Sequence, residues 1–460
     1  MTLGRRLLFA LLAGVFLAVA FPPWNLPQLL PLGLILLAPA LIGATGREAF
    51  YVGVLTGALY LGGTQFWLTS VFGMAAVSLI ALVAAFTVLF CCLLPWLARI
   101  FPKIPLPLLA ALLWVGIEHY RAQWFVLNFG WGSLGYAIAG KPAFAFFASL
   151  FGVHGISFAL VALGFACRTE LKRSAALTVI WAALCFYNPA PPAPERPLKV
   201  RLLQSMSDES YFLPRTIEAK SVGADIVVWP EYAVMEDPTN RLWPKIQEAV
   251  KQSDALLLLG GKDYQGRRND EIFKNTAYLI DTNGAIIGKH VKNHTVHLIN
   301  DGIKGTEAKA LNSPLGKLGV AICFDMDYSD VARRLAADGA EVFLVPNMDP
   351  GEWGPVQQMG HRLLFAMRAM ENNRWLARAD VAGGTSVNAP TGQVTAHVTT
   401  DGDAMLDATI GRNTHKTLFT QGGWLLGPIC TWLSVLGALY AGIQGANRSI
   451  QAKRGSCLGS

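Results

Sequence analysis

The chain is poor in charge. Asp, Glu, Lys and Arg together make up 15% of its 460 residues, whereas a soluble globular domain has about 25%. Hydrophobic residues account for 53%, and the mean hydropathy is +0.38. The deficit of charge argues against a wholly soluble chain. It predicts membrane spans, and the length leaves room for one globular domain of ordinary size.

Cysteine is too sparse for a disulfide framework or a metal centre. The seven cysteines stand at positions 91, 92, 167, 185, 323, 430 and 457. No CxxC pair and no Cys/His cluster with zinc-ligand spacing occurs, so no metal is expected. The polar middle of the chain contains Cys323 alone and cannot form a disulfide within itself. Taken by itself, Cys323 is either a small buried hydrophobe or a nucleophile.

The net charge of +7 does not mark a nucleic-acid-binding face. Much of it lies in short clusters beside apolar runs, at Arg5/Arg6, Arg47, Arg99/Lys103, Arg168/Lys172/Arg173 and Arg448/Lys453/Arg454. This placement is typical of membrane topology. No nucleic-acid partner is expected.

Long apolar runs predict about eight spans. The first is RRLLFALLAGVFLAVAF, which lacks a convincing cleavage site and is therefore not a signal peptide. The others lie near 28–44, 50–70, 75–98, 104–120, 143–167, 173–187 and 422–443. The cationic clusters all fall on one side of these spans, which the positive-inside rule makes cytoplasmic. Residues from about 190 to 420 are then expected on the opposite side.

The domain boundaries follow from the same pattern. A transmembrane helical domain is expected over 1–187, and a Pro-rich linker, NPAPPAPERP, over 188–197. Residues 198–415 alternate between strand-like and helix-like segments, which predicts a layered α/β domain. Strands are expected at KVRLLQSM, ADIVVWPE, ALLLLGGKD, NTAYLID, GKLGVAICFD, EVFLVPN and RWLARAD. A C-terminal transmembrane helix over 420–445 and a cytoplasmic tail over 446–460 complete the chain.

Three reactive side chains follow predicted strands of the α/β domain. IVVWPEYAV delivers Glu231, GKHVKNHTV delivers Lys292 and GVAICFD delivers Cys323. At a shared rim, the thiol can attack a carbonyl, the carboxylate can take its proton, and the lysine can stabilise the oxyanion. The lysine is also expected to lower the pKa of the thiol toward the reactive range. This pattern predicts acyl transfer with no metal or organic cofactor.

The ordered motifs WPE, KxH and GVAICFD resemble the Glu-Lys-Cys triad of the nitrilase, or carbon–nitrogen hydrolase, superfamily. The stretches NTAYLID, LVPNMD and AMRAMENNRWLARAD resemble its strands and its late helix. The resemblance implies an α-β-β-α sandwich. It also implies that Glu231 is the general base, Lys292 the oxyanion stabiliser and Cys323 the nucleophile, with Asn275 in support.

The membrane region adds a second resemblance. VLNFGWGSLGY (126–136) and LTGALYLGGTQFWLTSVFG (55–73) are similar to membrane segments of apolipoprotein N-acyltransferases. That family implies a periplasmic catalytic domain on the bacterial inner membrane. It further implies a phospholipid acyl donor, a Cys323 thioester, and the N-terminal amine of a diacylglyceryl-cysteine lipoprotein as acceptor. The aromatic residues of FGWGSLGY form either an interfacial belt or a lipid portal.

The chain departs from the family pattern around the site. Phe324 and Asp325 stand where the family usually has Tyr-Glu, and Asp325 is expected to keep the charge. Asn300 occupies the usual place of a second glutamate, with Asp301 next to it and Glu307 further on. The loop that follows is also shorter, which bears on the substrate more than on the reaction type. Asp301 and Glu307 are therefore the two candidates to replace the missing carboxylate.

Other polar residues receive simpler interpretations. Asp327 and Asp330 are expected to be helix-start acids, and His294, His297 and His361 structural or supporting residues. Three alternative functions stay open: a related membrane acyltransferase with another amine or lipid acceptor, a membrane-tethered amidase, and an inactive lipoprotein-binding homologue.

Overall fold

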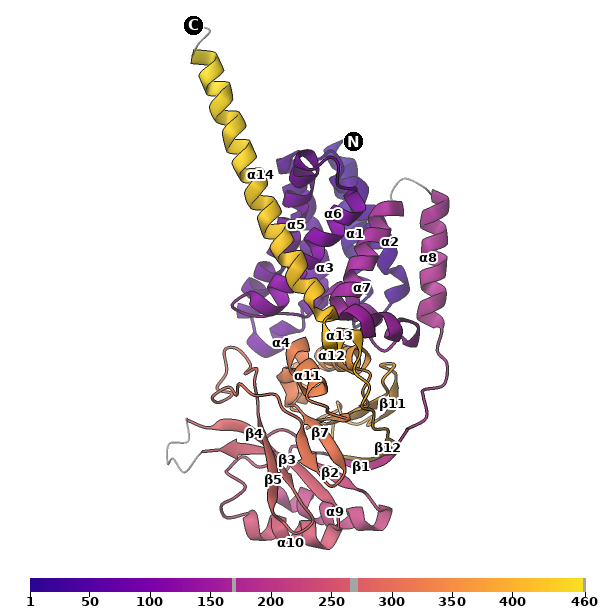
Figure 1. Cartoon of the computed structure of the whole chain (residues 1–460), viewed down its shortest axis with the longest axis vertical. Coiled ribbons are helices and arrows are strands. Elements are labelled where there is room, and N and C mark those ends of the chain that lie inside the picture. Colours follow the sequence, from indigo (N-terminus) through magenta and orange to yellow (C-terminus); the bar gives the residue numbers. More distant parts are fainter. Residues whose placement is uncertain (168–170, 265–271, 458–460) are drawn as a thin grey trace. The chain divides into compact units, whose positions relative to one another are not determined.

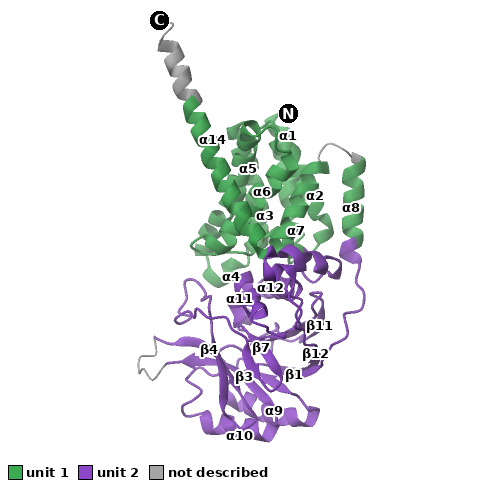
Figure 2. Ribbon diagram, in the orientation of Figure 1, with its two compact units in different colours: residues 1–137, 153–183, 424–460 green, residues 138–152, 184–423 purple. Residues whose placement is uncertain are grey.

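The computed structural model describes residues 1–167, 171–264 and 272–457 and falls into two compact units (Figure 1, Figure 2). Unit 1 comprises 1–137, 153–183 and 424–460, and unit 2 comprises 138–152 and 184–423. Arg168 and residues 458–460 of the predicted tail lie outside the described residues. So do the side chains of Arg448, Lys453 and Arg454.

Unit 1 is helical. It contains α1 (Leu3–Val19), α2 (Leu30–Leu41), α3 (Gly46–Gln65), α4 (Leu68–Phe72), α5 (Ala75–Ile100), α6 (Leu106–His119), parts of α7 (Ala145–Cys167) and α8 (Leu171–Phe186), and α14 (Leu426–Cys457). Every predicted span overlaps one of these helices. Among the described residues, three helical stretches are long and apolar enough to cross a membrane, at Ala75–Ile100, Pro142–Cys167 and Gly423–Asn447. The count of eight spans therefore stays a prediction.

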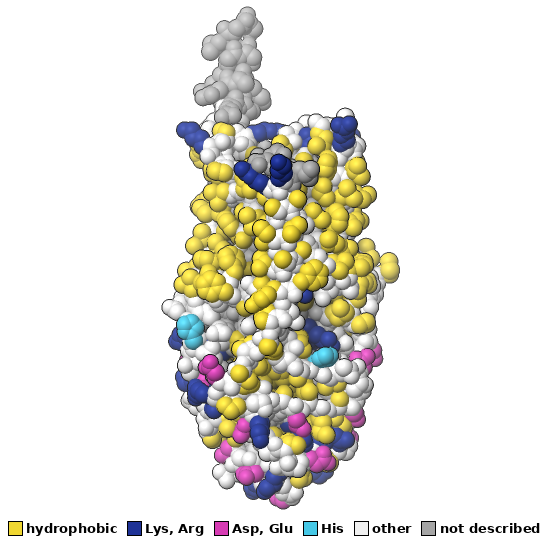
Figure 3. Space-filling view, turned by 90° about the vertical axis from the view of Figure 1, so that its right-hand side faces the viewer, with side chains coloured by type: hydrophobic (Ala, Val, Ile, Leu, Met, Phe, Trp, Pro, Cys, Tyr) yellow, Lys and Arg dark blue, Asp and Glu magenta, His cyan; other side chains and the backbone are white. Residues whose placement is uncertain are grey.

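The surface of unit 1 fits an apolar surrounding. On the face seen in Figure 3, hydrophobic side chains cover the helices, and Lys and Arg gather at one end. Acidic and basic side chains are scattered over the visible face of unit 2. Hydrophobic side chains on the outside of a helical bundle are what a lipid environment favours, because lipid tails are as apolar as the side chains.

The motif FGWGSLGY lies inside unit 1. Trp131 and Tyr136 are buried, and the Trp131 ring packs 4.5 Å from that of Trp67. The backbone of this loop is held by α6 and its continuation, because Arg121 donates to the Trp131 carbonyl (2.7 Å) and Glu118 accepts from the Leu134 N–H (3.0 Å). The interfacial-belt alternative is therefore wrong for Trp131 and Tyr136. Their rings are packed against protein.

Unit 2 contains two six-stranded sheets. The first has the order β12-β1-β2-β3-β4-β5 and the second the order β11-β10-β9-β8-β7-β6. The first sheet consists of β1 (Leu198–Gln204), β2 (Ile226–Val228), β3 (Leu256–Asp263), β4 (Lys274–Ile280), β5 (Ile286–Val291) and β12 (Ala404–Ile410). The second consists of β6 (Leu311–Ser313), β7 (Gly316–Val320), β8 (Val342–Pro346), β9 (Leu376–Ala379), β10 (Ser386–Asn388) and β11 (Val394–His397). The central strands β1–β2–β3 and β7–β8–β9 are parallel.

Alternating side chains of the central strands supply three apolar layers. Val200 and Leu202 point between the two sheets, whereas Leu203 points toward α9 (Glu209–Val222) and α10 (Trp243–Ser253). The second sheet packs on its outer side against α11 (Ser329–Ala337) and α12 (Pro355–Asn372). Burial on both faces explains the continuous apolar runs of the central strands. The predicted α-β-β-α sandwich is confirmed.

The strand that leads to the cysteine is shorter than predicted. The sequence suggested a strand through Asp325, but β7 ends at Val320 and Cys323–Asp327 form a 3-10 turn. Apolar character continues to Cys323 because Ala321, Ile322 and Cys323 are buried, although β7 itself has ended. Periodicity alone cannot separate burial from strand pairing.

Candidate active site

The three predicted reactive residues follow the carboxyl ends of three strands. Glu231 comes after β2, Lys292 directly after β5, and Cys323 after β7. Each is at most 4% exposed. The two sheets are tied together here, because the Glu231 backbone N–H donates to the Asn347 carbonyl after β8 (3.3 Å). Residues from both sheets therefore meet at one rim.

One ammonium is shared by two carboxylates. Lys292 Nζ lies 2.8 Å from Glu231 Oε1 and 2.8 Å from Asp301 Oδ2. Asn275, on β4, donates from Nδ2 to Glu231 Oε1 (2.6 Å) and to Asp301 Oδ1 (2.9 Å). Tyr232 donates its hydroxyl to Asp301 Oδ1 (2.7 Å). The arrangement brings Asp301 into the cluster beside the predicted base and lysine.

The charges of this cluster are set by burial and mutual contact. Burial raises the pKa of Glu231, and Asp301 adds to this effect, while Lys292 opposes it; the net shift is upward from 4.5. Burial opposes the charged form of Lys292, but Glu231 and the other neighbouring anions raise its pKa well above 10.5. For Asp301 the contact with Lys292 outweighs burial and lowers the pKa. Lys292 is thus an ammonium, and Glu231 is the more basic carboxylate.

Cys323 is held in an unusual backbone conformation, with φ at +45°. Its Sγ faces the Met348 carbonyl oxygen at 3.9 Å. Burial raises the pKa of the thiol well above 9.0, Glu231 adds to this, and Lys292 opposes it without reversing it. Lys292 thus lowers the pKa of the thiol, as expected, but burial outweighs this effect and the net shift is upward. The resting group is a neutral thiol, which needs a base to become a nucleophile.

Asp325 joins the segment of the lysine to the segment of the cysteine. Its Oδ1 accepts from the backbone N–H groups of Asn293 (2.8 Å) and His294 (2.9 Å). Its Oδ2 accepts from the Ile322 N–H (3.0 Å) and lies 2.9 Å from His290 Nε2. The carboxylate predicted at this position therefore accepts hydrogen bonds from backbone N–H groups in both segments.

The remaining predicted residues lie further from the cluster. Phe324 is half-buried and packs edge-on against Tyr328, with ring centroids 5.3 Å apart. Glu307 is exposed and pairs with Lys309 at 3.3 Å. Of the two candidates for the missing carboxylate, the structure brings Asp301 to Lys292 and leaves Glu307 on the surface.

Several contributing residues escaped the sequence analysis. Tyr232 directly follows Glu231 and donates its hydroxyl to Asp301. Its backbone has a φ of +55°. His290 precedes Lys292 by two residues. Because side chains alternate along a strand, the sequence of β5 could have placed both on the same face. Asp327 is not only a helix-start acid, since His361 Nε2 lies 2.8 Å from its Oδ1. No local pattern indicates that pairing.

A cavity of about 520 Å³ opens onto the cluster. Glu231, Tyr232 and Met348 line it, together with the exposed Met206 and Met235. The charged side chains of its lining include the acids Asp208, Glu209 and Glu236. The cation Arg241 also lines it. Across the described ranges, no group of three or more His, Cys, Asp or Glu residues is arranged to hold a metal ion.

Two family models match the chain. Residues 13–166 match the apolipoprotein N-acyltransferase N-terminal domain, and residues 182–418 match the carbon–nitrogen hydrolase domain. The second match spans more than half of the sequence, and it contains every residue of the cluster described above.

The chain is also similar to individual proteins. The chain is 26% identical to an apolipoprotein N-acyltransferase of Geobacter metallireducens, over 94% of each chain. It is 27% identical to one of Pseudomonas putida, over 95% of this chain and 96% of the relative. Among solved structures, a carbon–nitrogen hydrolase of Helicobacter pylori aligns with 52% of this chain and 94% of its own, at 17% identity and a TM-score of 0.41.

Proposed function

Because the chain belongs to the apolipoprotein N-acyltransferase family, we propose that it acylates the N-terminal amine of diacylglyceryl-cysteine lipoproteins in the bacterial inner membrane. The acyl donor is a phospholipid, and Cys323 carries the acyl chain as a thioester. The observation that carries this proposal is the buried cluster of Glu231, Lys292 and Asp301 at the rim where Cys323 lies.

In the first half-reaction, Glu231 takes the proton of the neutral Cys323 thiol, and the thiolate attacks an ester carbonyl of the phospholipid. Lys292 stabilises the oxyanion as an ammonium. The bond between the acyl carbon and the glycerol oxygen breaks, and the lysophospholipid leaves with the proton that Glu231 held. The raised pKa of Glu231 suits both directions of this transfer.

In the second half-reaction, the acceptor amine attacks the thioester carbonyl. Glu231 takes a proton from the amine and returns it to the sulfur as the C–S bond breaks, which leaves an amide and the free thiol. Met206, Met235 and Met348 give the cavity an apolar side for an acyl chain, and its acidic residues favour a cationic amine over an anion. Burial of the cluster keeps out water, which would otherwise hydrolyse the thioester.

Intact-mass analysis tests the first half-reaction. Purified protein is incubated with phosphatidylethanolamine or phosphatidylglycerol of defined chain length, next to the Cys323→Ala variant. We expect a hydroxylamine-sensitive mass gain of one acyl chain in the wild type only. Addition of a diacylglyceryl-cysteine peptide should then discharge the adduct and acylate the peptide amine.

The same experiment separates the alternatives. An adduct that forms but is not discharged by the peptide would leave the thioester in place and call for another amine or lipid acceptor. Folded protein with no adduct from any phospholipid would contradict the proposal. Turnover of small soluble amides would then indicate an amidase, and its absence an inactive binding protein.

A further inference from the structure

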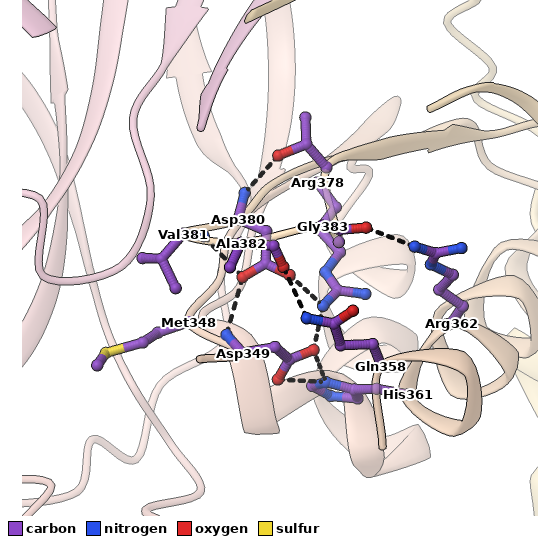
Figure 4. A network of polar contacts seen from close by, with 12 residues as sticks. Met348, Asp349, Gln358, His361, Arg362, Arg378, Asp380, Val381, Ala382 and Gly383 are labelled. Carbon is purple, nitrogen blue, oxygen red and sulfur yellow. Dashed lines mark hydrogen bonds and ion pairs between the residues drawn. The ribbon is translucent and has the colours of Figure 1, made fainter. Parts of the chain in front are cut away.

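A second buried group of charges lies beside the thiol in unit 2, and the chemistry above leaves it unused. Figure 4 shows Asp349, Asp380, His361 and Arg378 converging there, and Asp327 contacts the far side of His361. None of the five is more than 3% exposed. Buried charges of this kind persist only when they are paired.

Both ring nitrogens of His361 face carboxylate oxygens. Nδ1 lies 2.9 and 2.8 Å from the two oxygens of Asp349, and Nε2 lies 2.8 Å from Asp327 Oδ1. A neutral imidazole has only one N–H to donate, whereas an imidazolium has two. The two contacts therefore require the doubly protonated ring.

The two carboxylates belong to the two segments that enclose the thiol. Asp327 ends the 3-10 turn that begins with Cys323, and Asp349 directly follows Met348, whose carbonyl faces Sγ. The Asp349 backbone N–H donates to Asp380 Oδ1 (2.8 Å), and Arg378 pairs with both acids (Figure 4). Such anchoring matters because Cys323, at a φ of +45°, keeps its conformation only if its surroundings impose it.

We propose that the imidazolium of His361 is a positioning residue for the nucleophile: it fastens the Cys323 turn to the Met348 segment and so fixes where the thiol sits. In this role His361 acts through Asp327 and Asp349. The inference rests on the proposed function only in taking Cys323 as the nucleophile.

The electrostatics agree with this geometry. Burial alone lowers the pKa of His361, but Asp349 and Asp327 outweigh it and raise the pKa to about 9. Other groups packed around the network are Arg378, Asp380, Arg362, Gln357 and the Phe365 ring. Because the folded pKa lies above the ordinary 6.5, the stabilisation is complete below pH 6.5. It is lost as the pH rises through about 9.

Alkylation of Cys323 by iodoacetamide tests the positioning without any lipid. Its rate is followed by peptide mass spectrometry across the pH range, in wild type, His361→Gln, Asp327→Asn and the exposed-site control His397→Gln. In wild type and control, the logarithm of the rate should rise with pH and bend downward near pH 9. His361→Gln and Asp327→Asn should start about 10-fold to 100-fold lower at neutral pH. His361→Gln should also lack the bend.

Thermal melting establishes that each variant is folded. Variants with lowered melting temperature but wild-type rate and bend would overturn the proposal and leave His361 a purely structural residue. Should His361→Gln not fold, the wild-type profile decides, since a rise without a bend contradicts the proposal. Normal alkylation without any acyl adduct from phospholipid would instead refute the lipid donor and leave the positioning role intact.

Discussion

At the scale of single residues, the site depends on how Lys292 is shared. Its ammonium lies 2.8 Å from Glu231 and from Asp301, so two negative charges meet one positive charge in a buried place. Asp301 holds its own charge firmly and pushes the pKa of Glu231 upward. The proposed base, Glu231, thus has its pKa raised by burial and by the carboxylate of Asp301, which follows Asn300 directly.

The Asp301→Asn substitution tests the role of this carboxylate. An amide keeps the hydrogen bond from Tyr232 but removes the charge opposite Lys292, so we expect thioester formation to slow by about 10²- to 10³-fold. Glu307→Gln is the matched control and should behave as wild type, because the Glu307 carboxylate is exposed and pairs with the exposed Lys309. Slow acylation by Glu307→Gln, with normal acylation by Asp301→Asn, would reverse the assignment.

The pH dependence of acylation follows from the raised pKa of Glu231. Below that pKa the carboxyl is protonated and cannot accept the thiol proton, so the single-turnover rate should fall as the pH falls through a value above 4.5. Burial is the main cause of the raised pKa, but Asp301→Asn removes the negative charge that adds to it, so the acidic limb of this variant should move to lower pH. Identical limbs in the two proteins would show that another group controls the profile.

At the scale of elements, the close approach of β2 and β3 sets the position of Glu231. A Cβ on Gly260, in β3, would lie 2.6 Å from the Pro230 carbonyl oxygen and 2.7 Å from Glu231 Cα. The backbone that carries the base therefore lies directly over a glycine, and any other residue would displace it.

Gly260→Ala should push the Glu231 backbone away from the strand. We expect the free energy of unfolding to fall by about 1–3 kcal/mol. We also expect the rate of thioester formation to fall, because the displaced backbone carries Glu231. Thermal melting and intact mass measure the two effects. Gly402→Ala is the control, since the nearest atom to its Cβ would be Thr400 Oγ1 at 3.7 Å. Full activity of Gly260→Ala would contradict the close approach.

Asp325 connects the segment of the lysine to the segment of the cysteine through hydrogen bonds to backbone N–H groups. In Asp325→Asn one oxygen becomes an NH₂ group that faces N–H donors. At least one buried group is then unsatisfied, which costs about 1–3 kcal/mol. We expect lower melting temperature and slower Cys323 acylation together. Asp330→Asn, at a partly exposed ion pair with Arg334, should cost less than about 1 kcal/mol. Equal effects of both substitutions would deny Asp325 a special role.

At the scale of the whole molecule, the open question is how the chain crosses the membrane. Eight spans place residues from about 190 to 420 outside and the cationic turns inside. Single cysteines at the exposed positions Ser207 and Lys103, in a background lacking Cys92 and Cys457, test this. An impermeant maleimide should label Ser207→Cys from the periplasmic side and Lys103→Cys from the cytoplasmic side. Labelling of both from one side would disprove the odd number of spans predicted between the two positions.

The sequence was informative wherever the signal is local. Buried parallel strands have continuous apolar runs, so the central strands of both sheets were predicted. Glu231 and Cys323 were singled out after such strands because their side chains are reactive. The edge strands β6, β11 and β12 and the three-residue strand β10 were missed because they are short or half-exposed and have no distinctive run. The predicted spans include apolar helices such as Pro27–Leu41, which satisfy hydropathy but are shorter than the three long stretches.

By itself, the sequence predicted a layered α/β domain, a helical region and the placement of Glu231, Lys292 and Cys323 after strands, because strand periodicity and residue chemistry are local properties of the chain, whereas the sandwich and the triad roles came from the family resemblance. Only the tertiary structure brought Asp301 rather than Glu307 to Lys292, buried the thiol so that its pKa is raised, and paired His361 with Asp327 and Asp349. Those outcomes depend on burial and on contacts between residues distant in the sequence, and neither is encoded in any single segment.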